Sequence, residues 1–263
     1  MNIVVCVKQV PDTWSEKKLD PSDNTLDRAG TDPVMNEMDE YAVEEALQLV
    51  EAHGGEVTIL SMGPASCADT VRKALSMGAD KAVHVVDDAL HGSDAAATSL
   101  ALAKAVARIE AEARVDLVLT GSESSDARMS VVPAMMAERL GRAQLTFAKE
   151  VVIDGDTVRV KRLTDDGHQV VEAAMPAVVS VVEKINEPRY PSFKGIMAAK
   201  KKPVESLSLT DLGIDAGEVG LVGAWTRVVS FTSAPPRQAG TVVTDDGTGA
   251  DKLVEFLVAK KFV

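Results

Sequence analysis

The stretch DLVLTGSESSDARMSVV, residues 116–132, decides how this chain folds. Its apolar start, residues 116–120, is typical of a strand that is buried on both faces of a sheet. Gly121 ends that strand, and a Ser-rich loop leads into a helix predicted over residues 130–140. A strand that passes through a short loop into a helix is the repeating unit of a parallel sheet.

The same unit recurs before residue 116. We predict strands at 3–7, 57–60 and 82–86, and helices at 39–50, 66–77 and 95–111. This alternation predicts an α/β fold with a doubly wound, mostly parallel sheet. After residue 149, predicted strands at 151–153, 157–163 and 170–173 are separated by the turn signals DGD and DDG, which favour a small antiparallel extension. A strand at 178–182 is expected to return to the main sheet.

The last part of the chain lacks such patterns. Residues 203–247 are rich in Pro, Gly and Thr with little periodicity, and a last helix is predicted over 250–262. A long segment without a core pattern is unusual inside one domain. We therefore predict a domain over 1–202 and a C-terminal arm over 203–263.

The composition excludes several classes of protein. The net charge of -12 argues against a general nucleic-acid binder, because the phosphate backbone would repel it. The chain has no run of 18 apolar residues, and its start, MNIVVCVKQV, lacks the basic region of a signal peptide. We therefore expect no membrane insertion and a cytoplasmic location, with Cys6 and Cys67 as buried thiols.

Ligands of open parallel sheets bind at the carboxyl ends of the strands. Among the loops expected there, 121–130 is the best candidate for an anion, since Gly and Ser let backbone N–H groups point inward at a helix start. The alternative is that Ser124, Ser125 and Asp126 only cap the helix, and the residues alone favour this alternative. Asn36 precedes a predicted helix and is either its N-cap or a ligand-facing side chain.

No motif for side-chain catalysis is present. The sequence has no dinucleotide-binding glycine motif, P-loop, C-x-x-C pair or nucleophile elbow. His53, His84, His91 and His168 are scattered, so we expect no metal site. The acids at 37–40 fall at a helix start, where they complement the helix dipole. The residues alone favour a binding or carrier protein, without catalytic residues, over an enzyme.

The stretch RYPSFKGIMAAKKK, residues 189–202, is basic within an acidic chain and places Phe193 in an apparent loop. Together with the preceding NEP at 186–188, it resembles the signature of the beta subunit of electron-transfer flavoprotein. The likeness covers essentially the whole chain. Its further motifs are VKQVPD at 7–12, DEYAVEEAL at 39–47, GPA at 63–65, MGAD at 77–80, DLVLTG at 116–121, MPAVVSV at 175–181 and PPRQAG at 235–240.

The resemblance implies a nucleotide-binding fold like that of the adenine-nucleotide hydrolases. It also implies a heterodimer with an alpha subunit that holds most of one FAD, while this chain binds AMP as a structural nucleotide. The C-terminal arm and helix would pack on the alpha subunit. Electrons would come from acyl-CoA and related dehydrogenases, as in fatty acid β-oxidation, and pass to a membrane quinone oxidoreductase. The redox chemistry would belong to FAD, and the chain would be a carrier subunit rather than an enzyme.

The resemblance also assigns residues to three sites. Cofactor binding falls to Cys6, Asn36, Glu37, Met38, Asp39, Met62, Gly121, Ser122, Glu123, Ser124, Ser125, Asp126, Ala127, Arg128, Met129, Ser130, Val131 and Val132. The flavin-proximal residues are Val10, Thr13 and Met38. A recognition loop near 186–202 would dock on dehydrogenases through Arg189, Tyr190, Phe193, Ile196, Met197, Lys200 and Lys201. The alternative for Phe193 is that it tucks into its own core and leaves the lysines solvated.

Several features depart from the family pattern. The family often has Asn-Pro-Phe at 36–38, and an aliphatic anchor in place of Phe193. Its loop often reads Gln-Ala-Ile-Asp-Gly-Asp-Thr at 123–129, so Asp126 is kept, the Thr is lost and Arg128 is gained. Two alternatives therefore stay open. One is a bifurcating form with a second FAD in place of AMP and NADH as donor. The other is a stand-alone adenine-nucleotide-binding module, which would need neither the recognition loop nor the arm.

Overall fold

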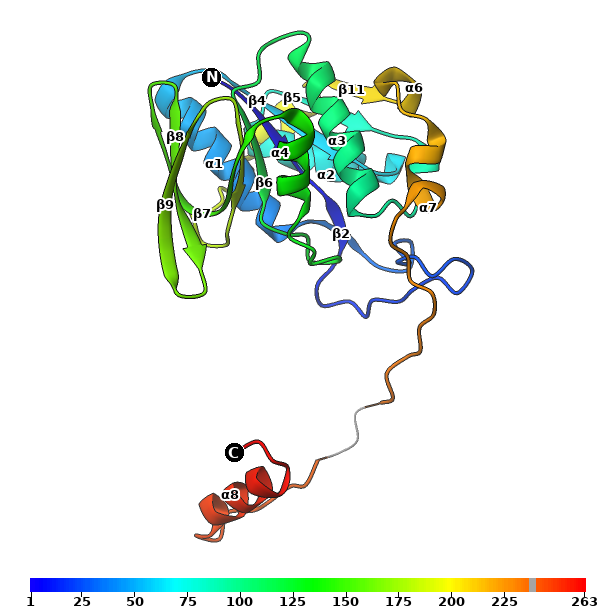
Figure 1. The fold of residues 1–263 in the computed structure, drawn as a ribbon, viewed down its shortest axis with the longest axis vertical. Coiled ribbons are helices and arrows are strands. Elements are labelled where there is room, and N and C mark those ends of the chain that lie inside the picture. The colour runs from blue at the N-terminus through cyan, green and yellow to red at the C-terminus, as the bar shows by residue number, and fades with distance from the viewer. Residues whose placement is uncertain (237–239) are drawn as a thin grey trace. The chain divides into compact units, whose positions relative to one another are not determined.

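The computed structural model describes residues 1–236 and 240–263 (Figure 1). Residues 237–239, within the PPRQAG motif, lie outside the described residues. The chain divides into two units, Met1–Val229 and Ser230–Val263, which are described separately. The first unit has an α/β fold with a mostly parallel sheet, which confirms the predicted fold class.

The main sheet has nine strands. In spatial order they are β11 (Val204–Leu207), β5 (Lys81–Val85), β4 (Glu56–Met62), β1 (Asn2–Cys6), β6 (Leu117–Gly121), β10 (Ala177–Val181), β7 (Ala143–Asp154), β8 (Thr157–Thr164) and β9 (Gly167–Ala174). All pairs from β11 to β7 are parallel, whereas β7–β8 and β8–β9 are antiparallel. A second sheet pairs β2 (Gln9–Pro11) with β3 (Pro33–Met35).

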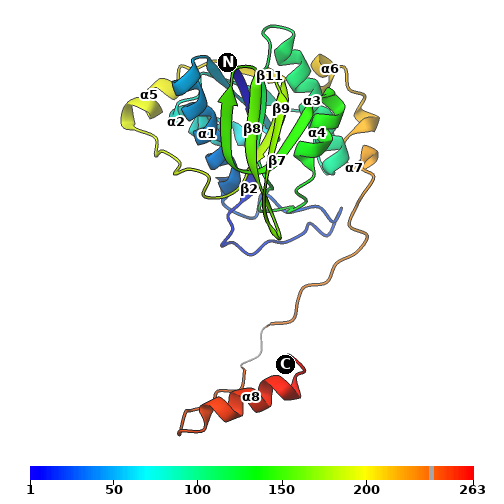
Figure 2. The same cartoon turned by 60° about the vertical axis from the view of Figure 1, so that its left-hand side comes forward.

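Helices cover both faces of the main sheet. They are α1 (Glu37–His53), α2 (Ala68–Met77), α3 (Ala95–Glu110), α4 (Val132–Leu140), α5 (Phe193–Ala199), α6 (Leu209–Leu212) and α7 (Gly220–Gly223). Figure 2 shows α1, α2 and α5 on one side of the sheet and α3, α4, α6 and α7 on the other. No helix among the described residues is both long and apolar enough to cross a membrane.

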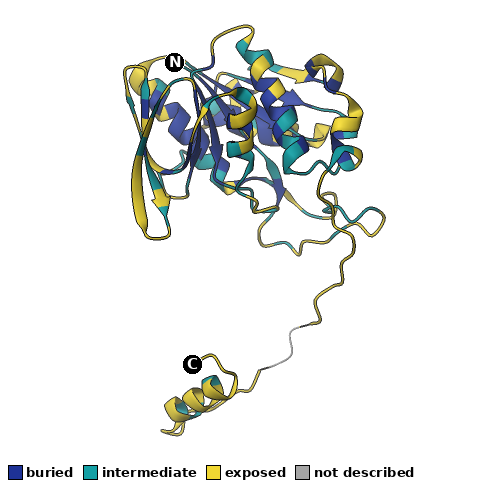
Figure 3. Ribbon diagram, viewed as in Figure 1, coloured by how far each residue is buried: buried dark blue, intermediate teal, exposed yellow. Residues whose placement is uncertain are grey.

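The continuous apolar runs of the parallel strands arise because each strand feeds two cores. Along β1, Ile3 and Val5 pack in the cluster under α1 and α2, whereas Val4 packs in the cluster under α3 and α4. Side chains of a strand alternate between its two faces, so a strand covered on both sides is apolar throughout. In Figure 3 the buried residues accordingly concentrate in these central strands.

The antiparallel extension is longer than predicted. The expected strands at 157–163 and 170–173 correspond to β8 and β9, joined to their neighbours by tight turns. The strand expected at 151–153 is only the end of β7. The first half of β7 runs parallel to β10, and the register shifts between Ala148 and Val151 before the strand pairs with β8. This change of partner and register hid the strand from a simple periodic pattern.

The predicted boundary between residues 202 and 203 differs from the structure, where the first unit extends to Val229. Strand β11 pairs with β5 at the sheet edge, and Leu207, Leu212 and Val219 are buried in the cluster with α3. These elements are only a few residues long, too short for a periodic signal. In the second unit, α8 (Gly249–Ala259) matches the predicted last helix and exposes several apolar side chains, namely Leu253, Val254, Phe256 and Val258.

Candidate functional site

The carboxyl ends of β1, β4 and β6 are neighbours in the sheet and bring the predicted residues Cys6, Met62 and Gly121 to one edge. Burial, and then the nearby Asp39 carboxylate, raise the pKa of the Cys6 thiol to about 12. The thiol is therefore neutral near pH 7 and contributes packing rather than nucleophilic chemistry.

Asn36 holds the Ser-rich loop in place. Its Nδ2 donates to the Glu123 carbonyl and to Asp39 Oδ1, both at 2.9 Å, and its Oδ1 accepts from the Ser125 N–H at 3.0 Å. The side chain is buried and makes no capping bond to α1, although Asn36 occupies the N-cap position. The structure thus gives Asn36 a third role beside the two alternatives: it joins the start of α1 to the loop after β6.

Asp39 lies buried at the first turn of α1. Burial raises the pKa of its carboxyl to about 7, although hydrogen bonds from Asn36 and from the Lys8 and Gly121 N–H groups act in the opposite direction. The group therefore changes charge near neutral pH. Complementing the helix dipole does not account for its placement, because its oxygens accept from Lys8 N at 2.8 Å and from Asn36 Nδ2.

Gly121 lets α1 approach β6 this closely. A Cβ atom at Gly121 would lie 2.5 Å from Met38 Cβ and 2.6 Å from Asp39 Oδ1. A side chain at this position would push α1 away from the strand. The close approach sets the half-buried Met38, one of the predicted flavin-proximal residues, against the start of the loop.

Asp126 is neutralised by two cations. Lys8 Nζ lies 2.8 Å from Asp126 Oδ1, and Arg28 NH2 lies 2.8 Å from Asp126 Oδ2. The carboxylate is only 2% exposed. Burial alone would raise its pKa, but Lys8, the Ser124 hydroxyl and Arg28 outweigh burial and hold the pKa at about 2. Lys8 and Arg28 thus outnumber Asp126, while Glu123 in the same loop and Asp39 next to Lys8 add negative charge.

The helix-cap interpretation of Ser124, Ser125 and Asp126 is wrong. Helix α4 begins at Val132, beyond the reach of these side chains, and its N-cap, Val131, makes no side-chain bond. Ser124 Oγ instead accepts from Lys8 Nζ at 3.2 Å. The predicted helix start at 130 was therefore early, and the whole loop is free of a capping role.

The rest of the loop closes on itself. Ser130 Oγ donates to Glu123 Oε2 at 2.8 Å, and the Ser122 N–H extends the sheet by donating to the Val181 carbonyl. Arg128 and Ser130 have φ values of +48° and +55°, which are uncommon for residues other than glycine. Such conformations often occur in binding loops. Of the other predicted residues, Glu37, Ala127, Arg128 and Met129 are exposed, and Val131 and Val132 are half-buried.

The residues at this edge fit an anionic nucleotide. Ser61 Oγ, next to Met62, and Ser125 Oγ are both buried without a hydrogen-bond partner among the described residues. Buried hydroxyls without partners are unusual, and each can hydrogen-bond to a polar atom of a bound molecule. Together with the Lys8 and Arg28 side chains, they form a donor set suited to phosphate and sugar oxygens.

The first loop carries the other two predicted flavin-proximal residues. Val10 is buried in β2, whereas Thr13 is exposed beyond the end of that strand. Of these two residues, Thr13 is the one that presents its side chain outward.

Arg189 forms ion pairs with α1 of the same chain. Its Nε donates to Glu44 Oε2 at 2.7 Å, and its NH1 donates to Glu51 Oε1 at 2.6 Å. Asn186 Nδ2 also donates to Glu45 Oε2 at 2.9 Å. These bonds fasten the segment before α5 to α1. Arg189, predicted to dock on partners, thus has a structural role in holding the segment.

The segment presents an exposed apolar group that we call the docking patch: Tyr190, Phe193, Ile196 and Met197. Phe193 is 81% exposed, so the alternative in which it packs into its own core is wrong. It begins a short helix rather than lying in a loop, because the Ser192 hydroxyl caps α5 by accepting from the Gly195 N–H at 3.0 Å.

The lysine run has two different parts. Lys202 Nζ donates to the carbonyls of Leu75, Gly78 and Ala79 and so caps the end of α2. Lys200 and Lys201 are exposed beside the docking patch.

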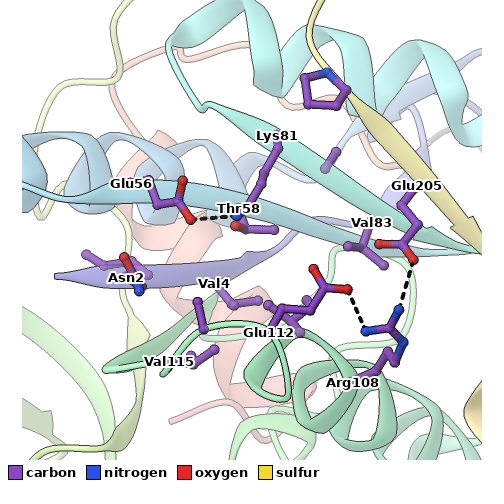
Figure 4. A pocket seen from close by; sticks show the side chains of 15 residues that line it. Asn2, Val4, Glu56, Thr58, Lys81, Val83, Arg108, Glu112, Val115 and Glu205 are labelled. Carbon is purple, nitrogen blue, oxygen red and sulfur yellow. Dashed lines mark hydrogen bonds and ion pairs between the residues drawn. The ribbon is translucent and has the colours of Figure 1, made fainter.

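A separate cavity of about 110 Å³ lies at the opposite edge of the sheet, near the amino end of β1 (Figure 4). Its charged side chains pair with one another: Arg108 contacts Glu112 and Glu205, and Lys81 contacts Glu56. None of the predicted site residues lines it. Within residues 1–236 and 240–263, no group of three or more acids, histidines or cysteines is arranged to hold a metal ion.

Sequence reasoning missed Lys8 and Arg28. Lys8 lies two residues after the end of β1, in a loop expected at the site, and that position was a usable signal. Arg28 lies in an irregular loop, and it meets a residue 98 positions further along the chain. No local pattern identified it.

Comparisons with known proteins identify the family of the chain. The model of the electron transfer flavoprotein domain matches residues 23–212. Electron transfer flavoprotein subunit beta of Mycobacterium tuberculosis is 51% identical over 100% of this chain and 99% of its own length. The subunit of the same name from Megasphaera elsdenii is 38% identical over the full length of both chains. The caffeyl-CoA reductase-Etf complex subunit CarD of Acetobacterium woodii is 35% identical over 99% of this chain and 97% of its own.

These likenesses cover the whole chain, from the first strand through the arm to the last helix. They show that the chain belongs to the electron transfer flavoprotein family, as a beta subunit.

Proposed function

We propose that this chain is half of a heterodimeric electron carrier. It accepts electrons from acyl-CoA and related dehydrogenases and passes them to a membrane quinone oxidoreductase. An alpha subunit holds most of the FAD, and this chain binds AMP as a structural nucleotide in the cytoplasm. FAD supplies the redox chemistry when bound. This chain's own residues position the cofactor and recognise the partners.

The docking patch carries this proposal. An apolar side chain as exposed as Phe193, held on a helix that is fixed by Ser192 and Arg189, is suited to enter a pocket on another protein. Burying one such side chain supplies on the order of 1.5–3 kcal/mol. A contact of that size suits a carrier that must bind, transfer electrons and leave.

The nucleotide site supports the second part of the proposal. Lys8, Arg28 and the Ser125 hydroxyl, which has no partner in the described part of the chain, offer donors to a phosphate. Asn36 holds the loop in shape before any ligand arrives. The exposed apolar side chains of α8 similarly support packing of the arm on the alpha subunit.

Electron delivery from a dehydrogenase tests the proposal. The chain is purified with its alpha subunit and mixed anaerobically with a substrate-reduced acyl-CoA dehydrogenase, and the loss of oxidised-flavin absorbance is followed. Phe193→Ala should lower the apparent second-order rate constant about tenfold, because the lost burial is worth about 1.5 kcal/mol or more. Val170→Ala, at a similarly exposed apolar residue on β9, is the matched control and should change nothing. Equal rates for all three proteins would contradict the docking role.

The likeness to CarD favours a second candidate, because that relative is named as a subunit of a reductase complex. In this form, the edge that we assign to AMP holds a second FAD and NADH is the electron donor. Reduction of the purified heterodimer by NADH alone distinguishes this candidate from the simple carrier.

A further inference from the structure

The loop between β2 and β3, residues 12–32, is folded rather than open. It closes at its base, where the Asp12 N–H donates to the Asp32 carbonyl at 2.9 Å. Leu19 and Leu26 pair further out, so the loop forms a compact turn. We call it the first loop. It directly follows Val10 and includes Thr13, which the family likeness places near the flavin.

Side chains of the first loop reach the rest of the chain at three places, one of which is His91, whose Nε2 lies 2.7 Å from Asp23 Oδ2. On one side, Arg28 NH2 contacts Asp126, and Arg28 NH1 lies 3.4 Å from the Gln9 carbonyl. On the other side, Asn24 Nδ2 donates to the carbonyls of Val228 and Val229, both at 3.2 Å. The Arg28 contact leads to the nucleotide loop, residues 121–132, and the Asn24 contact leads to the end of the first unit.

Asp126 is a firm attachment point. Its carboxylate is 2% exposed and holds Lys8 with one oxygen and Arg28 with the other. The backbone of Lys8 is held by hydrogen bonds with Asn36 and Asp39 at the start of α1, whereas Arg28 belongs to an irregular loop. An ionised hydrogen bond to a buried carboxylate is stronger than one between neutral groups. The position of the nucleotide loop and that of the first loop are therefore linked through a single guanidinium.

We propose that Arg28 is a positioning residue that couples the nucleotide loop to the first loop, so that a nucleotide bound at residues 121–132 also orders the flavin-side segment. This inference rests on the nucleotide site proposed above. The coupling is reciprocal: if a bound nucleotide orders the first loop, then an ordered first loop strengthens nucleotide binding by the same factor.

The coupling predicts an effect of AMP on residues that do not bind it. The heterodimer is stripped of nucleotide, and amide hydrogen exchange of peptides from residues 12–32 is compared with and without added AMP. AMP should slow this exchange about tenfold in the wild-type protein, which corresponds to about 1.4 kcal/mol. In Arg28→Gln the AMP effect should disappear, and Arg28→Lys should restore part of it by keeping the charge.

Asn24→Gly is the matched control. It removes a second attachment of the first loop, leaves the contact between Asp23 and His91 in place, and suits the positive φ of 62° at that position. Exchange should rise generally in this variant, but its dependence on AMP should remain. If Arg28 had only a structural role, Arg28→Gln would raise exchange over residues 12–32 without removing its dependence on AMP.

Calorimetric titration of stripped protein with AMP tests the nucleotide site separately from its coupling to the first loop. AMP binding with no effect on residues 12–32, or with an effect that persists in Arg28→Gln, overturns the coupling and leaves the nucleotide site intact. The absence of AMP binding overturns both.

Discussion

Asn36→Ala should be the most damaging single change at the nucleotide edge. Asn36 is 1% exposed, and its amide makes three hydrogen bonds, to Asp39, Glu123 and Ser125. A hydrogen bond contributes about 1 kcal/mol net, and a buried group left without a partner costs about 1–3 kcal/mol. Water entering the new space recovers part of this loss, so we expect the free energy of unfolding to fall by about 3 kcal/mol.

Urea unfolding of the heterodimer at fixed concentration, followed by far-ultraviolet circular dichroism, measures this loss. With a denaturant slope of about 3 kcal/mol/M, the midpoint should fall by about 1 M. The variant should also retain less nucleotide, because the Ser125 N–H and the Glu123 carbonyl are released.

Gln48→Ala is the matched control, since Gln48 is an exposed amide on the same helix with one bond, to Glu44. It should cost less than about 1 kcal/mol. If the midpoint for Asn36→Ala does not differ from that of Gln48→Ala, Asn36 does not hold the loop as described.

Three further predictions follow from other contacts. Burial raises the pKa of Asp39 to about 7, so between pH about 4 and 7 the folded state keeps a proton on this carboxyl that the unfolded state has lost. The free energy of unfolding should therefore fall as the pH rises through this range, and Asp39→Asn should flatten that slope in urea unfolding. Arg189→Ala leaves the buried Glu44 carboxylate without its cation, so hydrogen exchange over residues 186–199 should rise about tenfold, whereas exchange in β1 should not change. Gly195→Ala would place a Cβ 2.5 Å from the Ser76 carbonyl, so α5 must shift; we expect a loss of about 1–3 kcal/mol in unfolding and weaker dehydrogenase binding by surface plasmon resonance.

The parts of the fold that were predictable are those governed by local pattern. Strands β1 and β6 carry the continuous apolar runs 3–5 and 117–119 because both of their faces are buried. The turn before β8 was predictable because an Asp-Gly pair favours the backbone of a tight hairpin. In both cases a few adjacent residues contain the whole signal.

The parts that were missed depend on tertiary contacts. Strand β11 is four residues long and is defined by its pairing with β5 rather than by its own sequence. Helix α5 lies among Pro, Ser and Gly residues and owes its place to close packing of Gly195 on α2.

The candidate site shows the same division. Its location followed from the topology of a parallel sheet and from the family likeness. The roles of Asn36 and Arg28 did not, because their partners lie 87 and 98 positions away in the sequence. A serine-rich loop before a helix suggested a cap, and only the late start of α4 at Val132 excluded it.

The nucleotide content of the heterodimer tests the central claim most directly. The chain is produced together with its alpha subunit, and the purified complex is denatured so that the released nucleotides can be separated and quantified by chromatography. A simple electron carrier with a structural nucleotide at residues 121–132 predicts one FAD and one AMP per heterodimer. Two FAD and no AMP would contradict that account and would indicate the bifurcating form.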